Sequence, residues 1–173
     1  MAEWPARWLA CLSALLLAGC VGYPSTLQPV ADFELDRYLG TWYEIARLDH
    51  RFERGMQQVS ATYSRNDDGS VRVLNRGFAV ASGEWETAEG KARFVEEADL
   101  GYLKVSFFGP FYGSYVVFGL DAEYQHAYVA GPDHDYLWLL ARTPTVSDAV
   151  YQDFLQRSAA AGFDTSALIR VTH

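Results

Sequence analysis

The stretch Gly40-Thr41-Trp42-Tyr43-Glu44-Ile45-Ala46-Arg47-Leu48 decides how the rest of the chain is interpreted. Its aromatic and β-branched residues predict a β-strand, which we place at 41–49. With a side-chain period of two, one face of that strand carries Trp42, Glu44, Ala46 and Leu48. Burying such a face would require a raised pKa for Glu44 or a nearby cation. Arg47 falls on the opposite face, so the sequence offers no partner for this carboxylate.

Short segments of strand-forming residues, separated by turns, continue to residue 142. Asn66-Asp67-Asp68-Gly69 is a strong turn because these residues tolerate positive φ. No helix alternates with the strands, which argues against a nucleotide-binding α/β fold, and we expect no cofactor. The pattern predicts an all-β antiparallel barrel or sandwich, with eight strands if 84–88 and 91–97 form one bent strand. The segments are 41–49, 57–66, 70–79, 84–88, 91–97, 102–108, 113–121, 124–130 and 135–142.

One helix follows the strands. Ser147 is a suitable N-cap, Pro144 precedes it, and Gly162 is placed to end it. Its spacing puts several apolar side chains on one face, so we expect the helix to lie against the outside of the barrel. These side chains are Val146, Val150, Phe154 and Leu155. A last short strand, 168–171, could pair at a sheet edge.

The composition excludes several classes of protein. The chain has 173 residues, with 14 Lys and Arg against 22 Asp and Glu, for a formal charge of -8. It has no basic run, so we expect no nucleic-acid partner. The 5 Trp, 11 Tyr and 10 Phe indicate a large apolar interior or an apolar binding site. The four histidines are scattered, and we expect neither a metal site nor an enzyme.

The N-terminus has the pattern of a processing signal. Residues 8–19 are apolar but too short to cross a bilayer as a helix, which takes about 20 residues. Leu17-Ala18-Gly19-Cys20 resembles the lipobox of bacterial lipoproteins, although an ordinary signal peptide with a coincidental Cys remains an alternative. The resemblance implies that residues 1–19 are removed and that Cys20 is lipidated. Val21 then favours the outer membrane. We expect 20–32 to be a flexible, lipidated tether and 33–173 to be the folded domain.

Three motifs, in order along the chain, resemble those of the lipocalin family. They are Gly40-x-Trp42, Leu120-Asp121-x-x-Tyr124 and Arg142-Thr143-Pro144, and the resemblance covers about residues 33–172. It implies an eight-stranded antiparallel up-and-down β-barrel with one C-terminal α-helix packed outside. In that family the Trp plugs the closed end and the Arg stacks on it, so Trp138 should point inward nearer the open end. The expected structural residues are Gly40, Trp42, Asp121, Tyr124 and Arg142.

A lipocalin barrel implies a ligand cavity whose mouth is formed by alternate loops, here 49–56, 80–83, 107–113 and 131–135. Alternation along 103–107 turns its apolar side chains inward. Tyr112 and Trp138 can each donate a hydrogen bond, which suits a fatty-acid carboxylate or a lysophospholipid phosphate. The expected ligand-binding residues are Leu103, Val105, Phe107, Tyr112, Tyr136 and Trp138.

The leading hypothesis is a carrier that stores or transports fatty acids or lysophospholipids, anchored by its lipid to the periplasmic side of the bacterial outer membrane. A second hypothesis keeps the fold but binds haem or a pigment, which an inward His126 would favour. A third is an envelope interaction protein, which predicts a filled barrel. The sequence leaves open whether the protein forms a homodimer.

Overall fold

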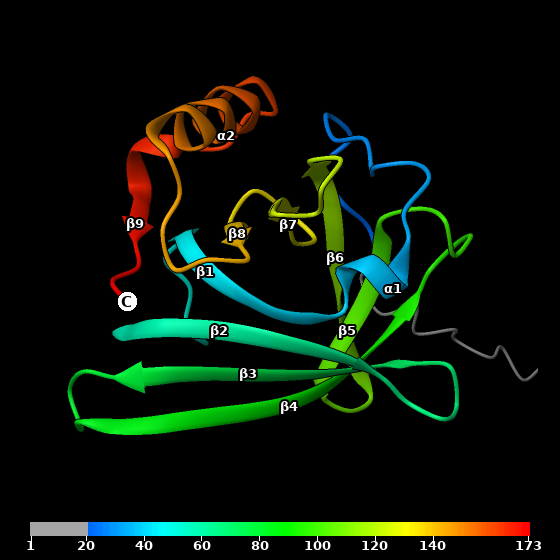
Figure 1. Cartoon of the computed structure of the whole chain (residues 1–173), viewed down its shortest axis with the longest axis horizontal. Coiled ribbons are helices and arrows are strands. Elements are labelled where there is room, and N and C mark those ends of the chain that lie inside the picture. The colour runs from blue at the N-terminus through cyan, green and yellow to red at the C-terminus, as the bar shows by residue number, and fades with distance from the viewer. Residues whose placement is uncertain (1–20) are drawn as a thin grey trace, which may run out of the picture.

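Eight antiparallel strands close into a barrel in the computed structural model, which describes residues 21–173 (Figure 1). Each strand pairs with the next along the chain, and β1 pairs with both β2 and β8, which closes the barrel. The barrel strands are β1 (Gly40–Leu48), β2 (Met56–Arg65), β3 (Val71–Ala79), β4 (Glu84–Phe94), β5 (Tyr102–Phe108), β6 (Phe111–Leu120), β7 (His126–Ala130) and β8 (Leu137–Ala141).

The predicted eight-stranded barrel is therefore confirmed, including the single strand that joins 84–88 to 91–97. That strand, β4, pairs with β3 without interruption from Glu84 to Ala92. The strand ends differ slightly from expectation. β7, for example, begins at His126, because Tyr124 has a φ of 57° and belongs to the preceding turn.

Side chains from three parts of the chain close one end of the barrel. The short helix α1 (Leu35–Tyr38) precedes β1, and the Trp42 indole donates a 2.8 Å hydrogen bond to the carbonyl of Tyr38. The Arg142 guanidinium lies 3.9 Å from the centroid of the Trp42 ring. Gly40 has a φ of 94°, a conformation that favours glycine, beside Arg142. This cation–π contact and the hydrogen bond from Trp42 to the Tyr38 carbonyl hold the closed end together.

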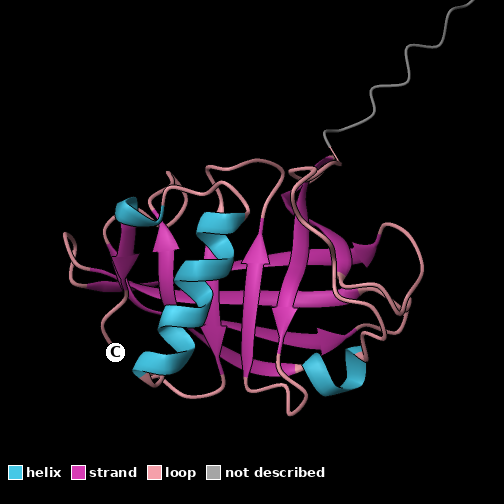
Figure 2. Ribbon diagram, turned by 90° about the horizontal axis from the view of Figure 1, so that it is seen from above, coloured by secondary structure: helices cyan, strands magenta, loops and turns pink. Residues whose placement is uncertain are grey.

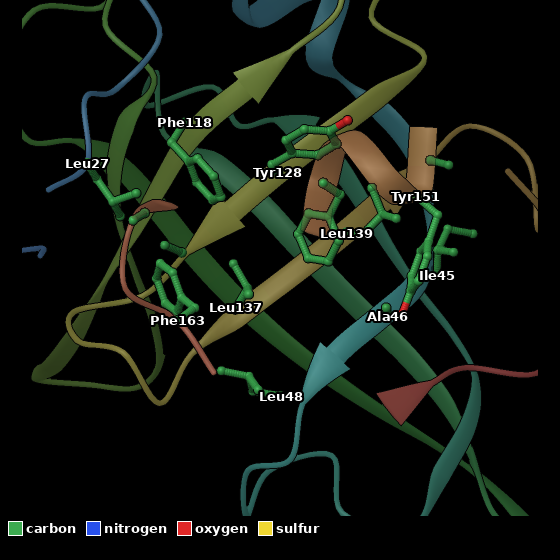
Figure 3. Packing of buried hydrophobic residues seen from close by; sticks show 14 residues of the cluster. Leu27, Ile45, Ala46, Leu48, Phe118, Tyr128, Leu137, Leu139, Tyr151 and Phe163 are labelled. Atoms are coloured by element: carbon green, nitrogen blue, oxygen red, sulfur yellow. The ribbon is translucent and has the colours of Figure 1, made fainter. Parts of the chain in front are cut away.

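The C-terminal helix α2 (Asp148–Ala160) packs outside the barrel as predicted (Figure 2). The Ser147 side chain accepts a hydrogen bond from the Val150 amide, as an N-cap should. The side chains it buries most completely are Tyr151, Phe154 and Ser158, whereas Val150 is only partly buried. Tyr151 and Phe154 belong to a cluster with Leu139 and its neighbours on the barrel's outer face, in which Figure 3 labels Tyr151 and Leu139.

The short strand β9 (Leu168–Arg170) follows the 3-10 turn η1 (Thr165–Ala167) and pairs antiparallel with β1. Beyond β9, the Gln58 amide donates to the carbonyl of Thr172, and the His173 ring contacts the Glu44 carbonyl. The C-terminal residues thus bind the backbone of β1 and β2 where both strands are irregular.

A β-bulge in β1 corrects the predicted strand faces. Glu44 pairs with Leu140 and Ala46 with Leu139, so Ile45 is an extra residue between them. Trp42 and Glu44 face the interior as expected, but Ala46 and Leu48 belong to the outer cluster beneath α2. The same shift turns Arg47 inward. The prediction that Arg47 lies opposite Glu44 was wrong because period-two counting fails across a bulge.

The described part of the expected tether is packed, not flexible. Leu27 is 2% exposed and belongs to the outer cluster. The Val30 amide donates to the carbonyl of Val117, and the Val30 carbonyl accepts from Gly101, so this segment adds backbone hydrogen bonds to the barrel. The expected signal peptide, residues 1–19, and the lipidation site, Cys20, lie outside the described residues. Within residues 21–173, no helix has the length and apolar character needed to cross a bilayer.

Candidate ligand-binding site

A cavity enters the barrel from the end opposite Trp42 and α1. Its mouth has a volume of about 600 Å³, and a deeper inner chamber has a volume of about 110 Å³. The mouth alone falls within the range of roughly 300–1,000 Å³ that is usual for small-molecule sites. The two chambers share the lining residues Glu53, Val59, Asn75, Val105, Phe107 and Trp138. This cavity overturns the hypothesis of a filled barrel.

The inner chamber is lined mainly by apolar side chains. Leu103, Val105 and Phe107 of β5 all line it. Gly90 of β4 makes room for the Phe107 ring, since a Cβ at Gly90 would lie 2.8 Å from Phe107 Cδ1. The remaining aliphatic lining comes from Leu35, Val59, Ala61, Val71, Val73, Ala92, Val129 and Leu140. A lining of this kind excludes water and suits a hydrocarbon chain.

Three tyrosines contribute hydroxyl groups to the inner chamber, beside the polar side chains of Glu44, Glu53, Ser60 and Asn75. The Tyr115 hydroxyl lies 2.7 Å from the Tyr38 hydroxyl and 2.9 Å from the Tyr63 hydroxyl. Burial raises the pKa of all three phenols, so they remain neutral. This group could not be predicted from the sequence, because its members come from α1, β2 and β6, and no spacing in the sequence brings them together.

The expected aromatic site residues lie at the mouth. Tyr136 and Trp138 line it, with ring centroids 6.1 Å apart. The Trp138 indole already donates a 3.1 Å hydrogen bond to Glu53 Oε2, so it does not offer a free donor to a ligand. Tyr112 also lines the mouth, at its rim, where Lys104 Nζ lies 5.2 Å from the centroid of its ring.

A buried ionic cluster lies where the mouth meets the inner chamber, with Glu53 lining both. Arg47 is 1% exposed, and its Nη1 donates a 2.8 Å hydrogen bond to Glu44 Oε1. Its Nη2 donates to the backbone carbonyls of Glu53 and Met56, at 2.8 and 3.1 Å. One guanidinium therefore holds the Glu44 carboxylate and also the end of the loop between β1 and β2 against the barrel interior.

Glu53 and His50 complete this cluster from the same loop. His50 Nε2 lies 3.0 Å from Glu53 Oε2; the His50 side chain is buried and that of Glu53 is largely buried. Burial and the charge of Glu53 raise the pKa of Glu44 well above its ordinary value of 4.5, although Arg47 opposes the shift. Burial acts on Glu53 in the same direction, but His50, Trp138 and Arg47 outweigh it and lower its pKa. Of the two carboxyls, Glu44 is therefore the one that holds a proton more readily.

His126, and the motif residues Asp121 and Tyr124, lie outside the cavity. His126 does not point into the barrel: its Nδ1 lies 3.4 Å from Asp121 Oδ1, on the outer side next to Val150 of α2. The hypothesis of a flat, His-ligated cargo thereby loses its supporting residue. Asp121 also accepts a hydrogen bond from the Gln125 amide, and the Tyr124 hydroxyl accepts one from Glu34. In residues 21–173, no group of His, Cys, Asp and Glu side chains is arranged to hold a metal ion.

A closed antiparallel barrel with an apolar cavity open at one end defines a β-barrel protein that binds small hydrophobic ligands. The Lipocalin-like domain family matches residues 33–173. The outer membrane lipoprotein Blc of Vibrio cholerae is 58% identical over 92% of this chain and 94% of its own length. The Escherichia coli protein of that name is 52% identical over 94% of this chain and 93% of its own.

The chain belongs to the lipocalin family. Its similarity to these relatives covers nearly the whole of both chains, and it places the protein at the bacterial outer membrane. Among solved structures, insecticyanin from the tobacco hornworm Manduca sexta superposes with a TM-score of 0.70. It covers 88% of this chain and 87% of its own at 21% identity, a likeness of fold alone.

Proposed function

We propose that this protein binds fatty acids or lysophospholipids and stores or transports them at the periplasmic side of the outer membrane. The observation that carries the proposal is the cavity itself, which narrows from a partly polar mouth to an inner chamber lined by apolar side chains. An acyl chain would lie along Leu103, Val105 and Phe107, where its methylene groups leave water. The protein acts in this proposal as a carrier, not as an enzyme.

The mouth offers cations for the head group of such a ligand. Arg51 and Arg76 both line it, and either could pair with a carboxylate or a phosphate. Tyr112 lies at the rim and can donate a further hydrogen bond. Because the indole of Trp138 is already bound to Glu53, we assign Trp138 and Tyr136 to packing against the first part of the acyl chain.

The proposal includes a lipid anchor. Leu17-Ala18-Gly19-Cys20 has the residues of a lipobox, and the relatives are named as outer membrane lipoproteins. Removal of residues 1–19 and acylation of Cys20 would leave a folded lipocalin attached to the membrane by several acyl chains, which is enough for stable binding.

A lipid titration tests the carrier function. Residues 21–173 would be titrated with palmitate and with lysophosphatidylcholine while the intrinsic tryptophan fluorescence is followed. We expect a saturable change that is reduced in Trp138→Phe and retained in Trp85→Phe, since Trp138 is the one tryptophan of residues 21–173 that lines the cavity. No response to either lipid, in folded and lipid-free protein, would overturn the proposal. A visible absorption band in the purified protein would instead indicate a pigment or haem cargo.

A further inference from the structure

The three tyrosine hydroxyls of the inner chamber have one proton more than they use among themselves. Each hydroxyl carries one proton, and the contacts of Tyr115 with Tyr38 and Tyr63, at 2.7 and 2.9 Å, use two of the three. These hydroxyls form no other hydrogen bond within residues 21–173. Buried donors in proteins are nearly always paired. The third proton is therefore available to an oxygen atom of a ligand in the chamber that these tyrosines line.

Ring packing fixes these hydroxyls at the closed end of the cavity. The Tyr38 ring lies 4.7 Å from the Trp42 ring and 5.6 Å from the Tyr63 ring, centroid to centroid. The Tyr115 ring lies 6.0 Å from that of Tyr63. Tyr38 and Tyr63 are only 3% and 7% exposed. The donor is thus held in position before a ligand arrives, which lowers the ordering cost of binding.

Asn75 is a second polar group that the inner chamber leaves without a partner. It lies two residues beyond Val73 on β3, and Val73 pairs with Tyr63, so about 7 Å along the strand separates Asn75 from the level of the tyrosines. Its Oδ1 atom is buried and accepts no hydrogen bond from any group in residues 21–173. The deep part of the cavity therefore offers both a donor and an acceptor, in a lining that is otherwise mainly apolar.

An anionic head group does not suit these positions. Glu53 lines both chambers, and its pKa is lowered despite burial because His50 and Trp138 stabilise the carboxylate. A carboxylate or phosphate that moved inward would leave Arg51 and Arg76 at the mouth and approach a charge of its own sign. A neutral oxygen atom on the acyl chain meets no such repulsion.

We propose that the inner chamber is a binding site for acyl chains that carry a hydroxyl group in the half of the chain remote from the head group. The chain hydroxyl accepts the third proton of the Tyr38, Tyr63 and Tyr115 group, and its own proton is accepted by a tyrosine oxygen or by Asn75 Oδ1. A plain chain leaves these groups unpaired, so the site favours the hydroxylated one. This inference rests on the proposed function, in which a lipid enters with its head group at the mouth.

Fatty acids that differ by one hydroxyl group test the site. Residues 21–173, which form the whole barrel, would be titrated calorimetrically with stearate, 12-hydroxystearate and 2-hydroxystearate. We expect 12-hydroxystearate to bind roughly 2- to 10-fold more tightly than stearate, the effect of one net hydrogen bond. The hydroxyl of 2-hydroxystearate stays beside the carboxyl group at the mouth, so this lipid should gain nothing from the tyrosines.

Removing the hydroxyls while keeping the rings assigns the effect to them. In the combined variant Tyr38→Phe, Tyr63→Phe and Tyr115→Phe, 12-hydroxystearate should lose its advantage while stearate binds at least as tightly as to the wild type. Tyr128→Phe is the matched control: this buried tyrosine bonds Asp153 Oδ2 outside the cavity at 2.8 Å, and the advantage should persist without it. The comparison of the three lipids in the wild type holds even if the combined variant fails to fold.

Three results would overturn the inference. Equal affinity of the wild type for stearate and 12-hydroxystearate, or an advantage that persists in the combined variant, would show that the tyrosines only close the barrel. Weaker stearate binding by a folded combined variant would show that the carboxyl group itself lies at the tyrosines. If the wild type bound none of the fatty acids, the carrier function would be contradicted as well, which distinguishes that failure from the other three.

Discussion

Arg47 is buried inside the barrel among oxygen atoms of the backbone and of Glu44. Replacing it by methionine nearly keeps the volume but removes the cation, which leaves the buried Glu44 carboxyl and the carbonyls of Glu53 and Met56 without their donor. We expect Arg47→Met to lower the free energy of unfolding by about 3–5 kcal/mol, as measured by urea denaturation. The loop between β1 and β2 should also become more accessible to proteases, because Arg47 binds the carbonyls of Glu53 and Met56.

Arg54→Met is the matched control. Arg54 lies on the same loop, but its ion pair with Asp49 is exposed, so its loss should change stability by no more than about 1 kcal/mol. Adding Glu44→Gln to Arg47→Met should recover part of the loss, since an amide at position 44 does not need a cationic partner. If the two arginine variants proved equally stable, the buried cluster would not hold the loop as described.

Glu44 should make stability depend on pH in a defined direction. Its pKa is raised in the folded chain, so as pH rises from about 4.5 the folded state retains a proton that the unfolded state has lost. Stability should therefore fall with rising pH until the raised pKa is passed. Urea denaturation at a series of pH values should show a flatter profile for Glu44→Gln than for the wild type. Parallel profiles would mean that Glu44 does not hold this proton.

Individual residues show where sequence-based prediction succeeds and where it stops. Leu103 and Trp138 could be placed in the cavity because regular alternation, or a fixed number of residues from Arg142, determines the face. The orientation of Arg47 could not be predicted, because the residue types around it do not indicate the β-bulge at Ile45. The contact between Glu53 and Trp138 joins residues 85 apart in sequence, and it depends on how a loop folds over the barrel.

Among the elements, the segment from Gly22 to Phe33 departs most from expectation. Leu27 is buried in the outer cluster, on the same side of it as Phe118 and Phe163 (Figure 3). We expect Leu27→Ala to destabilise the protein by about 2–5 kcal/mol through lost burial and a residual cavity. Gln28→Ala, at the exposed neighbouring position, should stay within about 0.5 kcal/mol of wild type. If thermal or urea unfolding gave the same stability for both variants, the result would support the expected flexible tether instead.

The remaining elements were predictable because each has a strong local pattern. Turn residues divide the strands, and Ser147 and Gly162 bound the helix that packs outside the barrel. The N-terminal segment carries Gly, Pro and Ser without periodicity, and its order comes from hydrogen bonds to strands far along the chain, such as the bond from Gly22 to Ser114. Composition alone cannot reveal such long-range pairing.

In the molecule as a whole, the barrel sheet carries one apolar region on its outer face and another on its inner face. The outer cluster lies between the barrel and α2 and stabilises the fold, while the inner face surrounds the cavity. This division lets the barrel keep an unfilled interior, because α2 supplies packing on the outside. It also places the mouth of the cavity, with the exposed rings of Phe108 and Phe111, at the open end of the barrel.

The most direct measurement of the central claim is quenching of tryptophan fluorescence by a dibrominated stearate, since bromine quenches only at short range. We predict saturable quenching in the wild type and in Trp85→Phe, and much weaker quenching in Trp138→Phe, because Trp138 alone among the three described tryptophans lines the cavity. Equal quenching in all three proteins, or quenching that never saturates, would contradict a lipid held inside the barrel.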